Sequence, residues 1–452
     1  MPRRALAVLS LTSSVILAGC NVIGAVTGAP TTEQVTVQAP AGILVGDSAQ
    51  VRASATKSNG VTIPDLTPDA WRSSDPSVIS INTRGVMKGL IAGRQATIFA
   101  DFGGKTGSAI VTVGSDDSRL AYALADQPTA ASPYSPDAST RFSSSGGTIT
   151  VTRTSVGQYT VRFAGLGRPP GGHDNVQVTG YGGVPVYCKP ALWDASSADL
   201  VVQVNCVLRD ATTADSKFTI LTLGARPFGA STPLGFLLSN GDTGTVILDS
   251  AGTARNSAGG TIAVGHSLDA AGAYSTLMVG LGPQSGGASG PVGLIVSGSG
   301  QGARRCHVDA YDLTAGGTAI GCNTAGGGLG DSPFSLLWFT RGRPGFRYGY
   351  AWANNAGTTL GYSPPPDVSA NSSNGAITSK RTGTGTYQIV FAGLAHATGA
   401  TEGVQVSAFG SSGYCTLASW GNSGANDLAA NITCWDNLAA PANFQFNILI
   451  VQ

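Results

Sequence analysis

Six of the seven cysteines in this chain recur as three pairs with the same surroundings. An aromatic residue follows the first cysteine of each pair by five positions, and a phenylalanine follows the second by twelve. The pairs are Cys188 with Cys206, Cys306 with Cys322, and Cys415 with Cys434. Recurring pairs of this kind are typical of disulfides in exported proteins. We therefore expect three disulfide-stapled copies of one unit. Pairing within each copy is a hypothesis, because six cysteines allow many other connectivities.

Two other uses of these cysteines fit the spacing less well. A zinc site needs four clustered ligands, and the pairs lack both a short Cys-x₂₋₄-Cys spacing and a histidine that recurs with them. A catalytic cysteine would not recur with a partner in every copy. Neither HExxH nor G-x-S-x-G occurs in the sequence. We therefore expect no metal, no cofactor and no enzymatic activity, with a hydrolase as a distant third hypothesis.

The pairs lie inside a longer repeat. Tyr159 and Tyr387 each open a Tyr-x-x-x-Phe-Ala-Gly-Leu strand, and Tyr274 opens a diverged version, at spacings of 115 and 113 residues. Across Tyr122–Leu166 and Tyr350–Leu394, 19 of 45 aligned positions are identical. A period this long exceeds a propeller blade or a solenoid coil, so each copy is predicted to be a separate domain. The predicted boundaries are 118–225, 226–340 and 341–452.

Composition favours an all-β chain. Charged residues make up 11%, against ~25% in average soluble proteins. The 64 glycines favour many tight turns between short strands, and no long stretch has the spacing of an amphipathic helix. A net charge of +1 supplies no basic field for nucleic acid, which we exclude as a partner. The predicted fold is a series of tandem β-sandwich domains.

The N-terminus reads as an export signal. In residues 1–19, Arg3 and Arg4 precede a short apolar stretch, too short and too interrupted to be a permanent membrane span. The segment ends in Leu17-Ala18-Gly19-Cys20, which resembles the lipobox of bacterial lipoproteins. That resemblance implies cleavage before Cys20, acylation of this residue, and a membrane tether over 20–30. An ordinary cleaved signal with an incidental Cys20 and a twin-arginine signal are the alternatives.

Residues 31–115 carry short strands with turn signals about every ten residues, the pattern of a β-sandwich. Trp71-Arg-Ser-Ser-Asp-Pro-Ser-Val, Gly85-Val, Ala92-Gly-Arg-Gln-Ala-Thr-Ile and the closing Val111-Thr-Val resemble the group 2 bacterial immunoglobulin-like domain. The resemblance implies display or spacing on a cell surface, and sometimes adhesion, without chemistry. Trp71 is predicted to be its core aromatic.

The aromatic residues five positions after the first cysteines, Trp193, Tyr311 and Trp420, have two readings. They could pack against the disulfides, as in immunoglobulin domains, or form a repeated platform for stacking sugars. A cationic position shared by Arg153, His266 and Arg381 reads as exposed strand or as a ligand contact.

The primary hypothesis is a non-catalytic surface lipoprotein for adhesion or ligand binding, with a glycan or a surface protein as partner. It would be lipid-anchored in the cell envelope, facing the periplasm or the exterior, with the repeats following one another as a stalk. The alternative is a purely structural envelope or extracellular-matrix component.

Overall fold

The computed structural model describes residues 29–229, 232–241, 252–267, 270–281, 291–312, 316–340, 346–397 and 401–452. The predicted signal segment and Cys20 lie outside these residues. Within them the chain is all-β, as the composition predicts, and the helical content is limited to the short 3₁₀ turns η1 (Ala138–Thr140) and η2 (Pro366–Val368). No helix in these ranges is long and apolar enough to cross a membrane.

The N-terminal domain, residues 30–114, is a sandwich of small sheets with the strand orders β1-β4-β5, β2-β10-β9-β6 and β3-β8-β7. Trp71 is half-buried and packs against both of its apolar clusters, so it serves the core as expected. The strands are β1 (Thr32–Gln38), β2 (Gly42–Leu44), β3 (Ser48–Gln50), β4 (Arg52–Lys57), β5 (Thr62–Ile63), β6 (Ala70–Ser73), β7 (Ile79–Ile81), β8 (Val86–Gly89), β9 (Gln95–Phe102) and β10 (Lys105–Gly114).

Each copy is a sandwich of two four-stranded sheets with the same internal order. In copy 1 (118–225) the first sheet is β12-β11-β18-β15 and the second is β13-β14-β17-β16. The strands are β11 (Leu120–Ala125), β12 (Arg141–Ser143), β13 (Ile149–Ser155), β14 (Gln158–Phe163), β15 (Asn175–Tyr181), β16 (Tyr187–Asp194), β17 (Leu200–Val207) and β18 (Lys217–Leu223).

Copies 2 (226–340) and 3 (341–452) repeat this order, as β20-β19-β26-β23 with β21-β22-β25-β24, and as β28-β27-β34-β31 with β29-β30-β33-β32. The strands of copy 2 are β19 (Leu234–Ser239), β20 (Ala254–Asn256), β21 (Ile262–His266), β22 (Ala273–Met278), β23 (Gly293–Gly298), β24 (Arg305–Asp312), β25 (Gly317–Asn323) and β26 (Phe334–Phe339). Those of copy 3 are β27 (Tyr348–Ala353), β28 (Ser369–Asn371), β29 (Ile377–Gly383), β30 (Thr386–Phe391), β31 (Gly403–Phe409), β32 (Tyr414–Ser423), β33 (Asp427–Trp435) and β34 (Gln445–Val451).

The two sheets of each copy differ in how they are buried. Strands of the second sheets, such as β13 and β30, alternate buried and partly exposed residues, because one face packs on the core and the other meets solvent. Strands of the first sheets, such as β11 and β26, are buried at every position. Their inner faces form the core of their own copy, and their outer faces join one apolar cluster drawn from all three copies. The first sheets therefore meet at the centre of the molecule.

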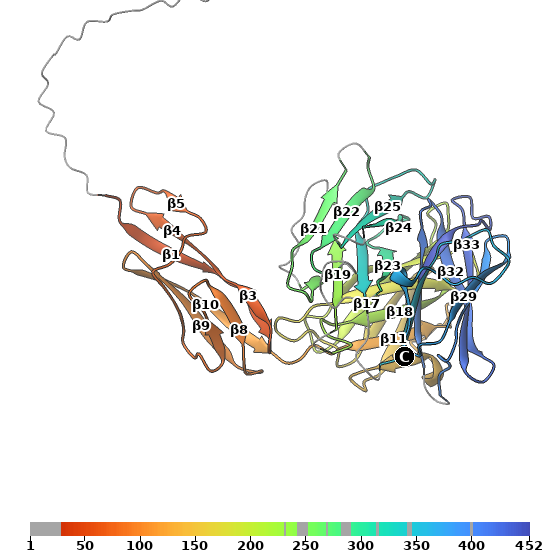
Figure 1. The fold of residues 1–452 in the computed structure, drawn as a ribbon, viewed down its shortest axis with the longest axis horizontal. Helices are drawn as coiled ribbons and strands as arrows, with labels where there is room; N and C mark the ends of the chain where they lie inside the picture. Colours follow the sequence, from red (N-terminus) through yellow and green to blue (C-terminus); the bar gives the residue numbers. More distant parts are fainter. Residues whose placement is uncertain are drawn as a thin grey trace, which may run out of the picture.

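The three copies close into a ring, which we call the head. The edge strand β15 of copy 1 pairs in parallel with β32 of copy 3 through Tyr181 and Leu417. In the same way, β31 of copy 3 pairs with β24 of copy 2 through Phe409 and Val308. These bridges merge sheets of different copies into two eight-stranded sheets. The equivalent strands β15, β23 and β31 contact one another around a central axis. The head is thus an approximate threefold ring and not the stalk that chain order suggests (Figure 1).

The third junction, between β23 of copy 2 and β16 of copy 1, has no strand pairing among the described residues. The bridging residues at the other junctions, Leu417 and Val308, each lie two positions after the first cysteine of their copy, and the equivalent residue of copy 1 is Pro190. A parallel bridge uses the N–H of this residue, which proline lacks. Side chains join the strands instead, since Gly298 N donates to Tyr187 Oη at 2.8 Å and Asn205 Nδ2 donates to Gln301 Oε1 at 2.6 Å.

The N-terminal domain is a separate lobe that abuts copy 1 and copy 2 (Figure 1). The guanidinium of Arg226 contacts Asp47 and donates to the carbonyl of Val45 at 2.9 Å, and Arg255 Nη1 lies 3.0 Å from Asp47 Oδ2. The backbones also approach closely, because a Cβ added at Gly114 would lie 1.9 Å from the carbonyl oxygen of Pro170. The two bodies are therefore joined by packed and ionic contacts as well as by the chain itself.

Candidate functional site

The three expected disulfides are present, one in each copy. They join Cys188 to Cys206, Cys306 to Cys322 and Cys415 to Cys434. The two cysteines of each bridge face one another on the neighbouring antiparallel strands of the second sheet, as Cys188 and Cys206 do on β16 and β17. All six are at most 5% exposed, so the bridges are structural parts of the cores.

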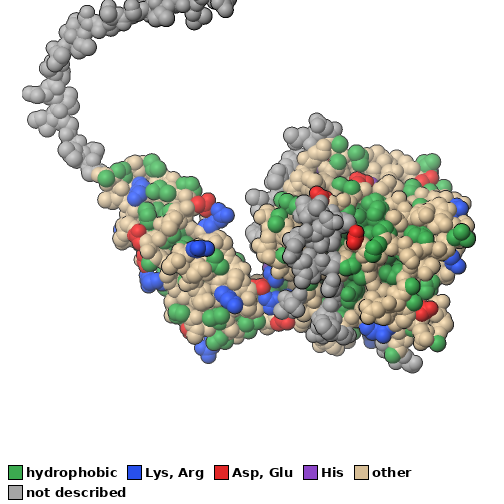
Figure 2. Space-filling view, viewed as in Figure 1, with side chains coloured by type: hydrophobic (Ala, Val, Ile, Leu, Met, Phe, Trp, Pro, Cys, Tyr) green, Lys and Arg blue, Asp and Glu red, His purple; other side chains and the backbone are tan. Residues whose placement is uncertain are grey.

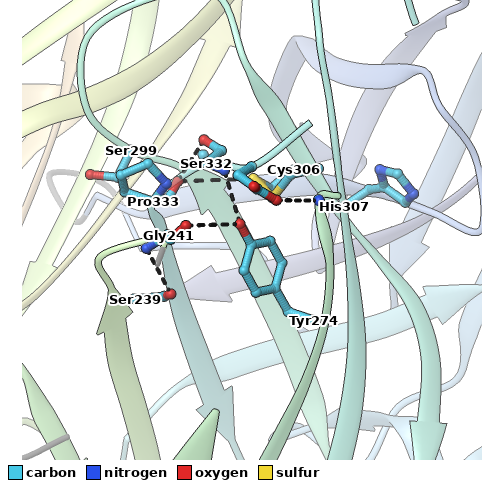
Figure 3. The surroundings of a disulfide bond; sticks show 12 residues. Ser239, Gly241, Tyr274, Ser299, Cys306, His307, Ser332 and Pro333 are labelled. Atoms are coloured by element: carbon cyan, nitrogen blue, oxygen red, sulfur yellow. Dashed lines mark hydrogen bonds between the residues drawn. A yellow bond between two sulfur atoms is a disulfide. The ribbon is translucent and has the colours of Figure 1, made fainter. Parts of the chain in front are cut away.

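The repeated tyrosine ties each disulfide region to the closing strand. Tyr159, Tyr274 and Tyr387 pack on the phenylalanine that opens this strand, with ring centroids 5.2, 5.1 and 5.3 Å apart. In copy 2 the hydroxyl of Tyr274 accepts from Ser332 N at 3.0 Å and donates to the carbonyl of Gly241 at 3.4 Å, beside Cys306 (Figure 3). The frame of tyrosine, cysteines and phenylalanine seen in the sequence is therefore the packing frame of each sandwich.

Two of the three aromatics five positions after the first cysteines lie at junctions between copies. Trp420 makes an edge contact with Tyr181 of copy 1 at 5.2 Å between ring centroids. Tyr311 packs on Phe409 of copy 3 at 5.2 Å, and its hydroxyl donates to Asn447. Trp193 is 8% exposed within the core of copy 1. None of these three rings is an open platform, since each is covered by its own core or by a neighbouring copy.

In copies 1 and 2 the residue at the shared position contacts a carboxylate of its own copy. Arg153 pairs with Asp215, with Nη2 2.8 Å from Oδ2, and His266 Nε2 lies 2.7 Å from Asp331 Oδ1. Hydrogen bonding by Arg153 is the main cause that lowers the pKa of Asp215. Both carboxylates also accept a backbone N–H from the turn before the repeated tyrosine strand, from Gly157 and Gly272. In copies 1 and 2 the position thus holds a turn. In copy 3 Asn443 accepts the equivalent N–H from Gly385, and Arg381 Nε makes no hydrogen bond among the described residues.

A set of residues that sequence reasoning did not single out meets at one end of the central axis. The residue before the first cysteine is Tyr187 in copy 1, Arg305 in copy 2 and Tyr414 in copy 3. The two tyrosine rings lie edge to face with centroids 5.8 Å apart, and the guanidinium carbon of Arg305 lies 4.4 Å from the Tyr414 centroid. Aligning the copies on their cysteines reveals this column, but only the ring brings its members together.

A small cavity of about 10 Å³ lies beside this set on the axis. It is lined by Tyr187, Tyr414, the first cysteine of each copy, and parts of β15, β23 and β31. By volume it holds about one water-sized particle. The strands around it carry buried polar side chains that bond across copies: Thr179 Oγ1 donates to Gln405 Oε1 at 2.8 Å, and Val178 N donates to Ser297 Oγ at 3.2 Å. The axis is therefore polar at this level and apolar where the first sheets meet.

A second buried cation lies at the third junction. Lys189, next to Cys188, is fully buried, and its Nζ donates to the carbonyl of Ser299 in copy 2 at 3.2 Å. Burial, with the nearby charge of Arg304, lowers the pKa of Lys189 to about 8. Within the described ranges no group of three or more His, Cys, Asp or Glu residues could hold a metal ion.

Comparison with known proteins adds little to this picture. No protein-family model matches the chain, and no curated protein matches it. Among solved structures, domains 4 and 5 of the S-layer protein SbsC align at 14% identity and a TM-score of 0.18, covering 42% of this chain and 92% of that one. Domains 1–6 of the same protein align at 10% identity and a TM-score of 0.19, covering 66% of this chain and 37% of that one. Scores this low do not establish a common fold.

Proposed function

We propose that the chain is a non-catalytic, lipid-anchored component of a bacterial cell surface. Cys20 carries the lipid, and the N-terminal domain, which we assign to the group 2 bacterial immunoglobulin-like domains, spaces the head from the membrane. The head acts as one rigid architectural body. Its role in the envelope is structural, and its surface faces the exterior or the periplasm.

The observation that carries this proposal is the use made of the repeated side chains. A ligand-binding array would keep equivalent aromatics open in every copy, whereas Trp420 and Tyr311 pack against Tyr181 and Phe409 of neighbouring copies. Two eight-stranded sheets that each span two copies and three internal disulfides favour a body that resists deformation. The visible face of the head is mostly uncharged, with few ionic side chains (Figure 2).

Adhesion is the second candidate, favoured by apolar side chains that stand out from the head. Leu360, Leu438 and Leu192 are 78%, 65% and 60% exposed. Side chains of this kind bind partners when several contribute to one surface. In an adhesive role, the rigid ring would hold exposed loops in place so that their apolar side chains could bind a partner.

The first test asks whether Cys20 is acylated and whether the protein is located in the membrane. The wild-type chain and a Cys20→Ser variant are expressed in a bacterial host with a radioactive or clickable fatty acid. We expect label and membrane fractionation for the wild type, and loss of both for Cys20→Ser. Wild-type chain that carries no label, or a variant that stays in the membrane with label, would refute the lipid anchor.

The second test separates the two roles of the head. Purified oxidised protein is applied to glycan arrays and whole cells beside a Leu360→Ser, Leu438→Ser variant, and a strain lacking the gene is tested for envelope integrity. Loss of integrity without binding supports the structural role. Binding that the double variant abolishes, with normal integrity of the deletion strain, would replace it by adhesion.

A further inference from the structure

Arg305 is a buried cation whose hydrogen-bonding groups have no partner. It opens β24 at the end of the central axis, next to Cys306, and is 1% exposed. Its Nε, Nη1 and Nη2 atoms make no hydrogen bond within the part of the chain that the structure describes. An unsatisfied buried polar group destabilises the folded state, and a charged group does so more strongly. We therefore expect a hydrogen-bond acceptor to bind the N–H groups of this guanidinium.

Two other arginines of low exposure, Arg119 and Arg226, show what such an acceptor normally is. Arg119 forms a bidentate pair with Asp117, at 2.6 and 3.0 Å, and a further bond to Asp174 at 2.7 Å. Arg226 likewise contacts Asp47 and Asp116. Among the described residues, Arg305 has no carboxylate of this kind. Its electrostatic neighbours are the hydroxyls of Tyr414 and Tyr187.

The ring of Tyr414 contacts only the flat face of the Arg305 guanidinium. The carbon of Arg305 lies 4.4 Å from the centroid of the Tyr414 ring, which is a cation–π distance. This contact leaves the N–H groups at the edge of the guanidinium free to donate. The edge is therefore suited to a bound anion, in the way that arginine binds anionic oxygens elsewhere.

Further donors lie beside it. The hydroxyl of Tyr414 is buried and has no hydrogen-bond partner among the described residues, and the same holds for Ser407 Oγ. Tyr187 Oη accepts from Gly298 N, which leaves its own proton to donate. Tyr187, Tyr414 and Ser407 all line the axial cavity. Residues that carry hydroxyl groups thus line a space for one small particle, and Arg305 lies next to this lining, against the ring of Tyr414.

We propose that the head binds one halide-sized anion, such as chloride, where the three copies meet, held by the guanidinium of Arg305 and the hydroxyl of Tyr414. Chloride is close to water in size, which suits a cavity of about 10 Å³, whereas phosphate and sulfate are much larger. The ligand would neutralise a buried charge at the point where residues of all three copies converge. It would stabilise the ring because it binds only the assembled head.

The test measures thermal unfolding of the full-length protein in chloride against gluconate at constant ionic strength, because gluconate is too large for the cavity. We expect the wild-type Tm to rise by a few degrees and then to saturate as chloride replaces gluconate. Crystals grown in bromide should give an anomalous peak in contact with the guanidinium of Arg305. A wild-type Tm that does not respond to chloride, or bromide crystals without that peak, would overturn the proposal.

Two variants tie the effect to the site. Arg305→Met keeps the length of the side chain and removes its charge, so its Tm should no longer respond to chloride. Arg304→Met removes the neighbouring, partly exposed cation and should respond as the wild type does. Should Arg305→Met fail to fold, Tyr414→Phe removes one donor and should raise the chloride concentration at half-saturation several-fold. An unchanged chloride response in Arg305→Met or in Tyr414→Phe would refute the assignment.

Discussion

The ring of Tyr350 in copy 3 lies directly against the backbone of Gly293 in copy 2. A Cβ at Gly293 would come within 2.7 Å of the ring. Tyr122 of copy 1 repeats the relationship with Gly403 of copy 3, again at 2.7 Å, and its hydroxyl donates to the carbonyl of Thr401 at 2.9 Å. The tyrosine that opens one copy thus packs on the first residue of the axial strand in the next. Copy 2 opens with Phe236 and lacks this hydroxyl.

Adding a methyl group at these glycines should weaken the ring. We expect Gly293→Ala and Gly403→Ala each to lower the free energy of unfolding by about 1–3 kcal/mol, because the tyrosine ring and its sheet must shift. Denaturant unfolding followed by fluorescence measures the change. Gly357→Ala is the control, since its added methyl would meet nothing closer than 3.9 Å. Equal stability of the three variants would contradict the close packing.

Much of each sandwich can be predicted from the sequence, because its signals are local. Alternation in the Tyr159 and Tyr387 strands marks one buried face, and the cysteine spacing marks the neighbouring strands that each bridge joins. The ring cannot be predicted in the same way. Leu120–Ala125 and Phe334–Phe339 are continuous apolar runs, which indicates burial on both faces without naming the partner.

The axial site is harder to predict from the sequence than the sandwiches are. Arg305 occupies a column whose other members are tyrosines, and an alignment of the copies shows this difference. Burial of Arg305 depends on Tyr414, more than 100 residues away, and on two bridges that each rest on a single residue pair. The role of Trp420 likewise depends on Tyr181 of a different copy. Contacts of this kind carry no periodic signal within either segment.

Removing one disulfide should lower the free energy of unfolding of the head. We expect the double variant Cys415→Ala, Cys434→Ala to lose roughly 3 kcal/mol, since the bridge closes a loop with a sequence separation of 19 residues. Both sulfur atoms are buried, so the alanines leave a small gap in addition. Denaturant unfolding of oxidised wild type and the variant measures the loss. A variant as stable as the wild type would show that packing alone fixes these strands.

The buried carboxylate of Asp117 should make the junction near the N-terminal domain sensitive to acid. Burial alone would raise the pKa of Asp117, but hydrogen bonds and charge from Arg119, with the N–H groups of His173 and Ala225, lower it below its usual value. The folded state therefore binds this proton more weakly than the unfolded state. The resulting stability is present above pH ~4 and is lost as the pH falls toward the lowered pKa.

The variant Asp117→Asn should lose about 1–3 kcal/mol at neutral pH, because it removes the bidentate carboxylate of Arg119, which keeps only its bond to Asp174. It should also lose less stability than the wild type between pH 4 and the acid end of the titration. The control is Asp65→Asn, which removes an exposed ion pair to Arg52 and should change stability by less than about 1 kcal/mol. A wild type and an Asp117→Asn variant with parallel acid titrations would refute this account.

Lys189 should also make stability rise with pH, but in the alkaline range. Burial lowers its pKa to about 8, whereas an unfolded lysine titrates near ~10.4. Between these values the unfolded state binds more protons, so stability should rise as the pH increases from 8 toward 9.5, by up to about 3 kcal/mol if the range were completed. Lys189→Met removes the charge and should be more stable than the wild type at pH 7, with a flatter dependence of stability on pH above pH 8.

Denaturant unfolding at several pH values, with the exposed Lys217→Met as the control, measures both effects. The two variants could instead show the same change of unfolding free energy with pH. That result would mean that Lys189 stays charged in the folded state over this range and that its bond to Ser299 compensates its burial.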